Sequence, residues 1–107
     1  MSNASRLITH YAALITRMRL DLFLKLSRLC PRRSLAQQLC DAGCVFLNGR
    51  LVKSSHNIKP GDEIKLRRRD HETVARVLIV PESRNVSRRD APSLIEIISD
   101  RELEPEL

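Results

Sequence analysis

Residues 18–49 read MRLDLFLKLSRLCPRRSLAQQLCDAGCVFLNG, and this stretch carries the strongest structural signals in the chain. Apolar side chains occupy most of the helical circumference over residues 19–29, which predicts a helix buried on two sides. Pro31 ends this helix, because proline disfavours a helical backbone in the residue before it. A second helix is predicted over 35–42, with Gly43 as its C-terminal stop.

Short strands and turns follow the two helices. Asn48-Gly49 is typical of a two-residue hairpin turn, and Pro60-Gly61-Asp62 indicates a second turn. The strands are predicted at residues 44–47, 51–52, 63–67, 73–80 and 94–98, with polar loops at 53–59 and 82–92. This order of elements predicts an α+β fold, with two helices packed on a small, mostly antiparallel sheet.

The 107 residues are enough for one domain with a modest core. Residues 1–17 are predicted to be an N-terminal extension, disordered or part helical. The domain itself is predicted over residues 18–81. Residues 82–107 are predicted to contain a loop, a short strand and an acidic tail.

The charge of the chain is positive and unevenly distributed. The formal net charge is +6, and residues 18–69 contain 12 Lys and Arg against 4 Asp and Glu, whereas residues 70–107 contain 5 against 9. A basic body with an acidic tail favours one localised binding face for a polyanion, either nucleic acid or an anionic membrane surface. With one Tyr, two Phe and no Trp, recognition of nucleic acid is expected through phosphates and shape rather than base stacking.

Other classes of protein are disfavoured by composition. No run approaches the roughly 20 apolar residues of a membrane span, and the start of the chain lacks the apolar core of a secretory signal. Cys30, Cys40 and Cys44 lack the spacing of a disulfide or redox motif, which predicts reduced thiols in the cytoplasm.

The start of the second helix carries an unusual charge. Ser34 followed by Gln37 matches a capping box, so Ser34 is predicted to be the N-cap. A helix N-terminus usually favours acidic neighbours by roughly 0.3–1 kcal/mol each, yet Arg32 and Arg33 stand here. Free backbone N–H groups beside two guanidinium groups indicate a phosphate site. The alternative is a pair of solvated linker arginines.

One polar stripe runs along the first predicted helix. Asp21, Lys25 and Arg28 are spaced at i, i+4 and i+7. Asp21 is expected to pair with Lys25, which leaves Arg28 facing outward beside the turn that precedes the second helix.

Several motifs occur together in one order. They are Arg-Leu-Asp at 19–21, Ser27-Arg28, Arg33-Ser34-x-Ala36, Gly43-x-Val45, Asn48-Gly49 and Lys59-Pro60-Gly61-Asp62-x-Ile64. With these motifs, residues 18–66 resemble the ribosomal-protein-S4-type RNA-binding domain, a two-helix αL motif on a small bent sheet. The likeness is strongest to small stand-alone bacterial members that act in ribosome quality control. It is weaker to the fifteen-kilodalton heat-shock protein, which has a long basic C-terminal extension.

The resemblance implies a function on the ribosome. It implies binding to large-subunit ribosomal RNA and to peptidyl-tRNA during rescue of stalled ribosomes, together with other quality-control factors. We expect a monomeric, cytoplasmic and non-enzymatic protein with no cofactor, no metal and no membrane contact. Stand-alone members usually begin near the equivalent of Met18, so residues 1–17 depart from the family pattern.

Seven residues are predicted to bind RNA. Arg32, Arg33 and Ser34 follow from the helix start, and the remaining positions follow mainly from the resemblance and from the loop after the hairpin. The full set is Arg19, Lys25, Arg28, Arg32, Arg33, Ser34 and Lys53. Arg67–Arg69 are not expected to form one patch, because successive strand residues point to opposite faces.

Three alternatives stay open at this point. The protein could be a heat-shock-type factor that recycles obstructed large subunits, or an RNA-binding fragment or accessory of an RNA-modifying enzyme. A DNA-binding helix-turn-helix would present Gln37, Gln38 and Asp41 to base edges.

A metal site of Cys40, Cys44 and His56 is less favoured than buried thiols, since Cys40 falls on an apolar helix face.

Overall fold

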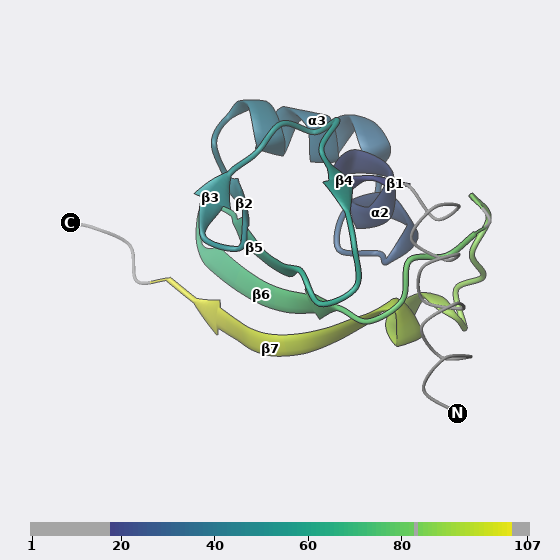
Figure 1. The fold of residues 1–107 in the computed structure, drawn as a ribbon. Helices are drawn as coiled ribbons and strands as arrows, with labels where there is room; N and C mark the ends of the chain where they lie inside the picture. The colour runs from purple at the N-terminus through teal and green to yellow at the C-terminus, as the bar shows by residue number, and fades with distance from the viewer. Residues whose placement is uncertain (1–17, 83, 104–107) are drawn as a thin grey trace.

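The computed structural model describes residues 18–82 and 84–103, and the predicted extension at 1–17 lies outside the described residues. Two short helices pack against a curved antiparallel sheet (Figure 1). The elements in chain order are β1 (Met18–Arg19), α2 (Leu20–Leu26), α3 (Arg33–Asp41), β2 (Val45–Leu47), β3 (Arg50–Leu51), β4 (Asn57–Ile58), β5 (Glu63–Arg67), β6 (His71–Val77), the 3-10 helix η1 (Ala91–Leu94) and β7 (Ile95–Glu102). This architecture confirms the predicted α+β fold.

The larger sheet has five strands in the order β3-β2-β5-β6-β7, and all neighbouring strands are antiparallel. The predicted hairpin is confirmed, since Asn48 and Gly49 both have positive φ values, 53° and 82°, as a type I′ turn requires. β5 occupies the residues predicted for it. β7 is eight residues long, not the short strand predicted, because it pairs with β6 from Ile95 to Glu102, with one bulge at Ile98.

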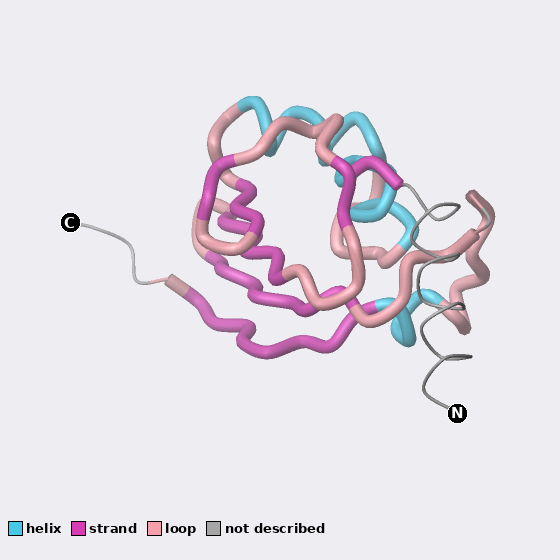
Figure 2. Tube along the Cα trace, viewed as in Figure 1, coloured by secondary structure: helices cyan, strands magenta, loops and turns pink. Residues whose placement is uncertain are grey.

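A second, two-stranded sheet joins β1 to β4 (Figure 2). The sequence predicted only a polar loop at 53–59, and this prediction is wrong for β4. Met18 pairs with Ile58, and both side chains are buried. The same loop accepts hydrogen bonds from the start of α2, from Leu20 N–H to the His56 carbonyl at 2.8 Å and from Asp21 N–H to the Ser54 carbonyl at 3.1 Å. Two residues are too few to show the alternation of apolar and polar side chains that identifies a strand in a sequence.

The first helix is shorter than predicted. α2 ends at Leu26, and Arg28 adopts a left-handed backbone conformation with φ of 67°. The backbone N–H of Cys30 then donates to the Leu24 carbonyl at 2.9 Å. The chain leaves the helix here because the turn carries Cys30, which is fully buried, into the core.

The second helix ends as predicted. Gly43 has φ of 75° and donates its N–H to the Cys40 carbonyl, while Cys44 N–H donates to the Leu39 carbonyl at 2.9 Å. These two bonds form a Schellman motif with glycine in its left-handed position. In the described part of the chain, no helix has the length and apolar character needed to cross a membrane.

The core lies between the helices and the inner face of the sheet. Its largest fully buried apolar side chains are Leu20, Phe23, Leu24, Cys30, Val45, Ile64, Leu66 and Val77. Phe23 is the largest of them and has no exposed surface. The helix α2 therefore contributes the centre of the core.

We expect Phe23→Ala to lower the free energy of unfolding by about 3–5 kcal/mol, because it removes a fully buried aromatic ring and leaves a cavity. Phe46→Ala is the matched control, since Phe46 is partly exposed and its ring centroid lies 5.5 Å from the Lys65 ammonium group. Its loss should be about 1 kcal/mol. Urea unfolding measures both values, and equal losses would contradict this placement of Phe23.

Candidate nucleic-acid interface

The buried carboxylate of Asp21 joins the N-terminal ends of the two helices. Asp21 has no exposed surface, and its Oδ2 atom accepts hydrogen bonds from Arg19 Nη2 at 3.1 Å and from Gln37 Nε2 at 2.9 Å. Its Oδ1 atom accepts the backbone N–H of Leu22 at 2.7 Å and lies 3.4 Å from Arg33 Nε. The predicted pair between Asp21 and Lys25 is therefore wrong. Asp21 points inward, toward partners on both sides, whereas Lys25 is exposed.

The contact between Arg33 and Asp21 is electrostatic. Arg33 Nε is buried and has no hydrogen-bond partner among the described residues, although it lies within ion-pair distance of the carboxylate. The Arg33 side chain as a whole is 37% exposed. Part of the guanidinium group is thus held against Asp21, while the rest reaches the surface.

These contacts determine the charge state of Asp21. Burial raises the pKa of this carboxyl group, but the opposing effects are stronger in sum. Hydrogen bonds from Gln37, Arg19 and Leu22 N–H and the positive charge of Arg33 bring the pKa below its ordinary value. Asp21 is therefore ionised at neutral pH and balances the two arginines.

The predicted capping box does not form. α3 begins at Arg33 with Arg32 as its N-cap, and no side chain among the described residues caps it. Ser34 lies inside the first turn and is exposed. Gln37, which would complete the box, instead donates to Asp21. The first turn also contains no acidic residue, so the N-terminal end of α3 stays electropositive.

The predicted RNA-binding residues fall into two groups. Arg19, Arg32, Arg33 and Ser34 lie around the start of α3, and the loop that contains Lys53 is hydrogen-bonded to the start of α2 beside them. Lys25 and Arg28 lie toward the other end of α2. The structure therefore does not bring all seven residues to one point.

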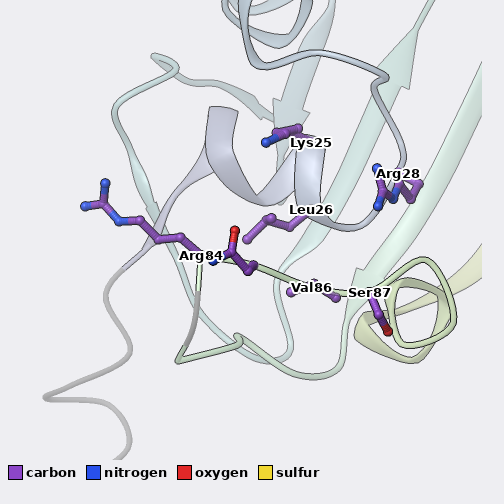
Figure 3. Close-up of a pocket in the computed structure, with 7 residues that line it drawn as sticks. Lys25, Leu26, Arg28, Arg84, Val86 and Ser87 are labelled. Carbon is purple, nitrogen blue, oxygen red and sulfur yellow. The ribbon is translucent and has the colours of Figure 1, made fainter.

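A hollow of about 430 Å³, which the sequence did not predict, lies beside α2 (Figure 3). It is lined by Lys25, Leu26, Arg28, Arg84, Asn85, Val86 and Ser87. Residues 84–87 lie far from α2 in the sequence, and the only available signal was the presence of arginines in the predicted polar loop. Their position against α2 is a product of tertiary packing.

Two other predictions concern arginine and cysteine side chains. Arg67–Arg69 do not form one patch, since Arg67 pairs with Glu72 at 3.5 Å and Arg68 reaches back to the Leu29 carbonyl.

Cys40 is buried as predicted, and burial raises the pKa of its thiol to about 11. Across the described residues, no three His, Cys, Asp or Glu side chains lie close enough together to hold a metal ion.

Known proteins are similar to this chain in fold and in sequence. Residues 18–64 match the S4 domain family. The RQC P-site tRNA stabilizing factor of Streptococcus pneumoniae is 37% identical over 87 residues, which cover 81% of this chain and 97% of the relative. The chain belongs to the family of RQC P-site tRNA stabilizing factors. The resemblance to S4-type domains noted in the sequence is therefore confirmed.

Further members of the family agree. The Helicobacter pylori strain 26695 factor of the same name is 40% identical over 73 residues, covering 68% of this chain and 87% of the relative. The Bacillus subtilis factor is 52% identical over 50 residues, which cover 47% of this chain and 58% of the relative, less than two thirds of its length. Among solved structures, the trimeric Heat Shock Protein 15 of Vibrio cholerae matches with a TM-score of 0.69 at 28% identity, covering 78% of this chain and 83% of that protein.

We expect Asp21→Asn to lower the free energy of unfolding at pH 7 by about 3 kcal/mol, because the variant leaves Arg19 and Arg33 without their buried counter-charge. The pKa of Asp21 is lower in the folded protein than in the unfolded chain. Its stabilising effect is therefore complete above about pH 4 and is lost as the pH falls through the folded pKa.

The difference in stability between the wild type and Asp21→Asn should consequently shrink as the pH is lowered from 7 toward 2. Urea unfolding at a series of pH values measures this difference. Asp41→Asn is the matched control, because Asp41 is exposed at the end of α3, and it should change stability by less than about 0.5 kcal/mol. A difference for Asp21→Asn that does not vary with pH would contradict the proposed role of its charge.

Proposed function

We propose that this protein is a non-enzymatic RNA-binding factor of the large ribosomal subunit, which contacts ribosomal RNA and peptidyl-tRNA during rescue of stalled ribosomes in the cytoplasm. The relatives named above are P-site tRNA stabilizing factors, and the S4 domain match covers both helices. The observation that carries the proposal is the uncapped N-terminus of α3, flanked by Arg32 and Arg33 and lacking acidic residues in its first turn.

The chemistry of this helix start suits a phosphate group. The N–H groups of the first turn have no partners within the helix, and the helix dipole favours an anion there. Arg32 is exposed and has no carboxylate partner among the described residues. Arg33 is oriented by Asp21, so its exposed N–H groups are held beside the same helix end. Two guanidinium groups and the free N–H groups together would hold RNA phosphates in one geometry.

The mechanism is positioning rather than chemistry. Phosphate contacts fix the orientation of a protein on RNA without reading sequence. A protein that holds a tRNA and ribosomal RNA together through such contacts favours one arrangement of the two. Lys53 is exposed on the loop that is hydrogen-bonded to the start of α2, and it would add a further positive charge to this site.

A heat-shock-type factor is the second candidate, and the structural likeness to Heat Shock Protein 15 favours it. The S. pneumoniae stabilizing factor is more similar in sequence, at 37% identity against 28%. The resemblance implies large subunits that carry peptidyl-tRNA as the target of both candidates, so the higher sequence identity to the stabilizing factor favours the first.

We expect the protein to co-sediment with large subunits that carry peptidyl-tRNA, and to dissociate steeply as salt rises. Each phosphate that is neutralised contributes roughly 0.7–0.9 to the negative log–log slope of affinity against salt. Wild-type protein that stays free of large subunits at low salt would contradict the proposed function. Equal binding to vacant and tRNA-bearing subunits would contradict the role of tRNA.

Arg32→Ala should weaken binding to large subunits about tenfold and make the salt slope less steep by roughly 0.7–0.9, because it removes one charged contact to phosphate. The variant is preferable to Arg33→Ala, which would also remove a contact of Asp21. Arg76→Ala is the control, since it removes the same charge from the sheet, where Arg76 pairs with Glu96 at 3.2 Å. Equal affinities for the two variants would place the RNA elsewhere.

A further inference from the structure

A second basic site lies at the other end of α2, in the hollow lined by residues 25, 26, 28 and 84–87 (Figure 3). We propose that this hollow holds an unpaired segment of RNA, with phosphates on Lys25, Arg28 and Arg84 and a sugar or base over Leu26 and Val86. The proposal rests on the RNA-binding function proposed above. It extends the binding surface beyond residues 18–64, to which the S4 domain match is confined.

The cations of the hollow have no counter-charge, unlike five other cations among the described residues. Lys25, Arg28 and Arg84 are exposed and have no carboxylate within ion-pair distance in the described part of the chain. No acidic residue lines the hollow. In contrast, the arginines at 19, 33, 67, 76 and 101 each lie within 3.5 Å of a carboxylate. Three unbalanced positive charges around a concave surface concentrate positive potential there.

The backbone at Arg28 points to a use for its side chain. Arg28 occupies the left-handed position after α2, with φ of 67°, and Gly43 occupies the same position after α3, with φ of 75°. Glycine adopts this conformation without strain, whereas a residue with a Cβ atom is disfavoured in it. A strained backbone at a residue with a Cβ atom indicates that its side chain is used for a function and not for the stability of the fold.

The arrangement of the cations favours a chain of phosphates over one small anion. In Figure 3, Arg28 stands at one side of the hollow, and the guanidinium group of Arg84 points away at the other side. The charged groups are therefore spread around the rim and do not converge on one point. An RNA backbone presents charges at successive positions and can meet such a rim.

Two apolar side chains, Leu26 and Val86, are part of the lining of the hollow. Leu26 is 4% exposed and belongs to the core, and Val86 is partly buried and packs against that core. A volume of about 430 Å³ is larger than one phosphate requires and lies within the usual range of ligand pockets. Apolar surface between cations suits the sugar or base of an unpaired nucleotide, because the bases of a duplex are stacked and enclosed.

The two basic sites are close enough for one RNA to reach both. α2 has seven residues, so its ends are separated by about 10 Å. Asp21, near the start of the helix, positions the residues around α3, and Arg28 follows its end. An RNA strand that leaves the start of α3 along α2 would arrive at the hollow.

The test compares Arg28→Gly and Arg84→Ala with Arg89→Ala, an exposed arginine of the same segment that does not line the hollow. The probes are large ribosomal subunits, an oligouridylate of about ten nucleotides and an RNA duplex of the same length. Arg28→Gly and Arg84→Ala should each weaken oligouridylate binding about fivefold and reduce the salt slope by roughly 0.7, while Arg89→Ala binds as the wild type. Arg28→Gly should not lower the melting temperature, because glycine relieves the left-handed backbone.

Three results would overturn the proposal. The first is that Arg28→Gly and Arg84→Ala bind RNA with the affinity and salt slope of the wild type, while Arg32→Ala binds more weakly. This result would leave the proposed function intact. The second is an equal loss of affinity for the duplex, since the hollow is proposed to take unpaired RNA. The third is full competition by inorganic phosphate at constant ionic strength, which would identify a site for a small anion. A wild-type protein that binds no large subunits would instead contradict the proposed function.

Discussion

The arrangement of the two helices depends on the buried carboxylate of Asp21. A charge without exposed surface is strongly unfavourable unless it is paired, and here Arg19, Arg33, Gln37 and the Leu22 N–H supply the partners. These groups come from β1, from α2 and from α3. Helices of seven and nine residues are too short to be stable alone, so such a connection between them matters for the fold. It also uses Gln37, and the start of α3 therefore remains open to another anion.

The same interaction divides the basic residues by role. Arg19 and Arg33 have a protein counter-charge and are held in defined positions, whereas Lys25, Arg28 and Arg32 have none among the described residues. A side chain that is already ordered loses less entropy when it binds. The free cations add charge without being positioned. A surface that combines the two kinds suits a polyanion whose phosphates must be attracted and then held.

The candidate site was only partly predictable. The residue types of the helix start and the family motifs predicted a site at the start of α3, which lies within the residues 18–64 that match the S4 domain. The contribution of residues 84–87 was not predictable, because a segment without periodicity gives no information about its neighbours. It is the packing of Val86 against the core that brings Arg84 to α2. Likewise, only the backbone angle distinguishes Arg28 from an ordinary surface arginine.

The sequence by itself determined the α+β class, the Asn48-Gly49 hairpin, the helix end at Gly43 and the position of β5, because turn residues and strand alternation act through local backbone geometry. Tertiary structure alone decided the partners of Asp21 and the pairing of β4 with β1. Gln37 donates to a carboxylate 16 residues away in place of the local cap predicted at Ser34. A local hydrogen bond competes with every partner that folding brings near, and a buried charge requires its donors more strongly than an exposed helix end requires its cap.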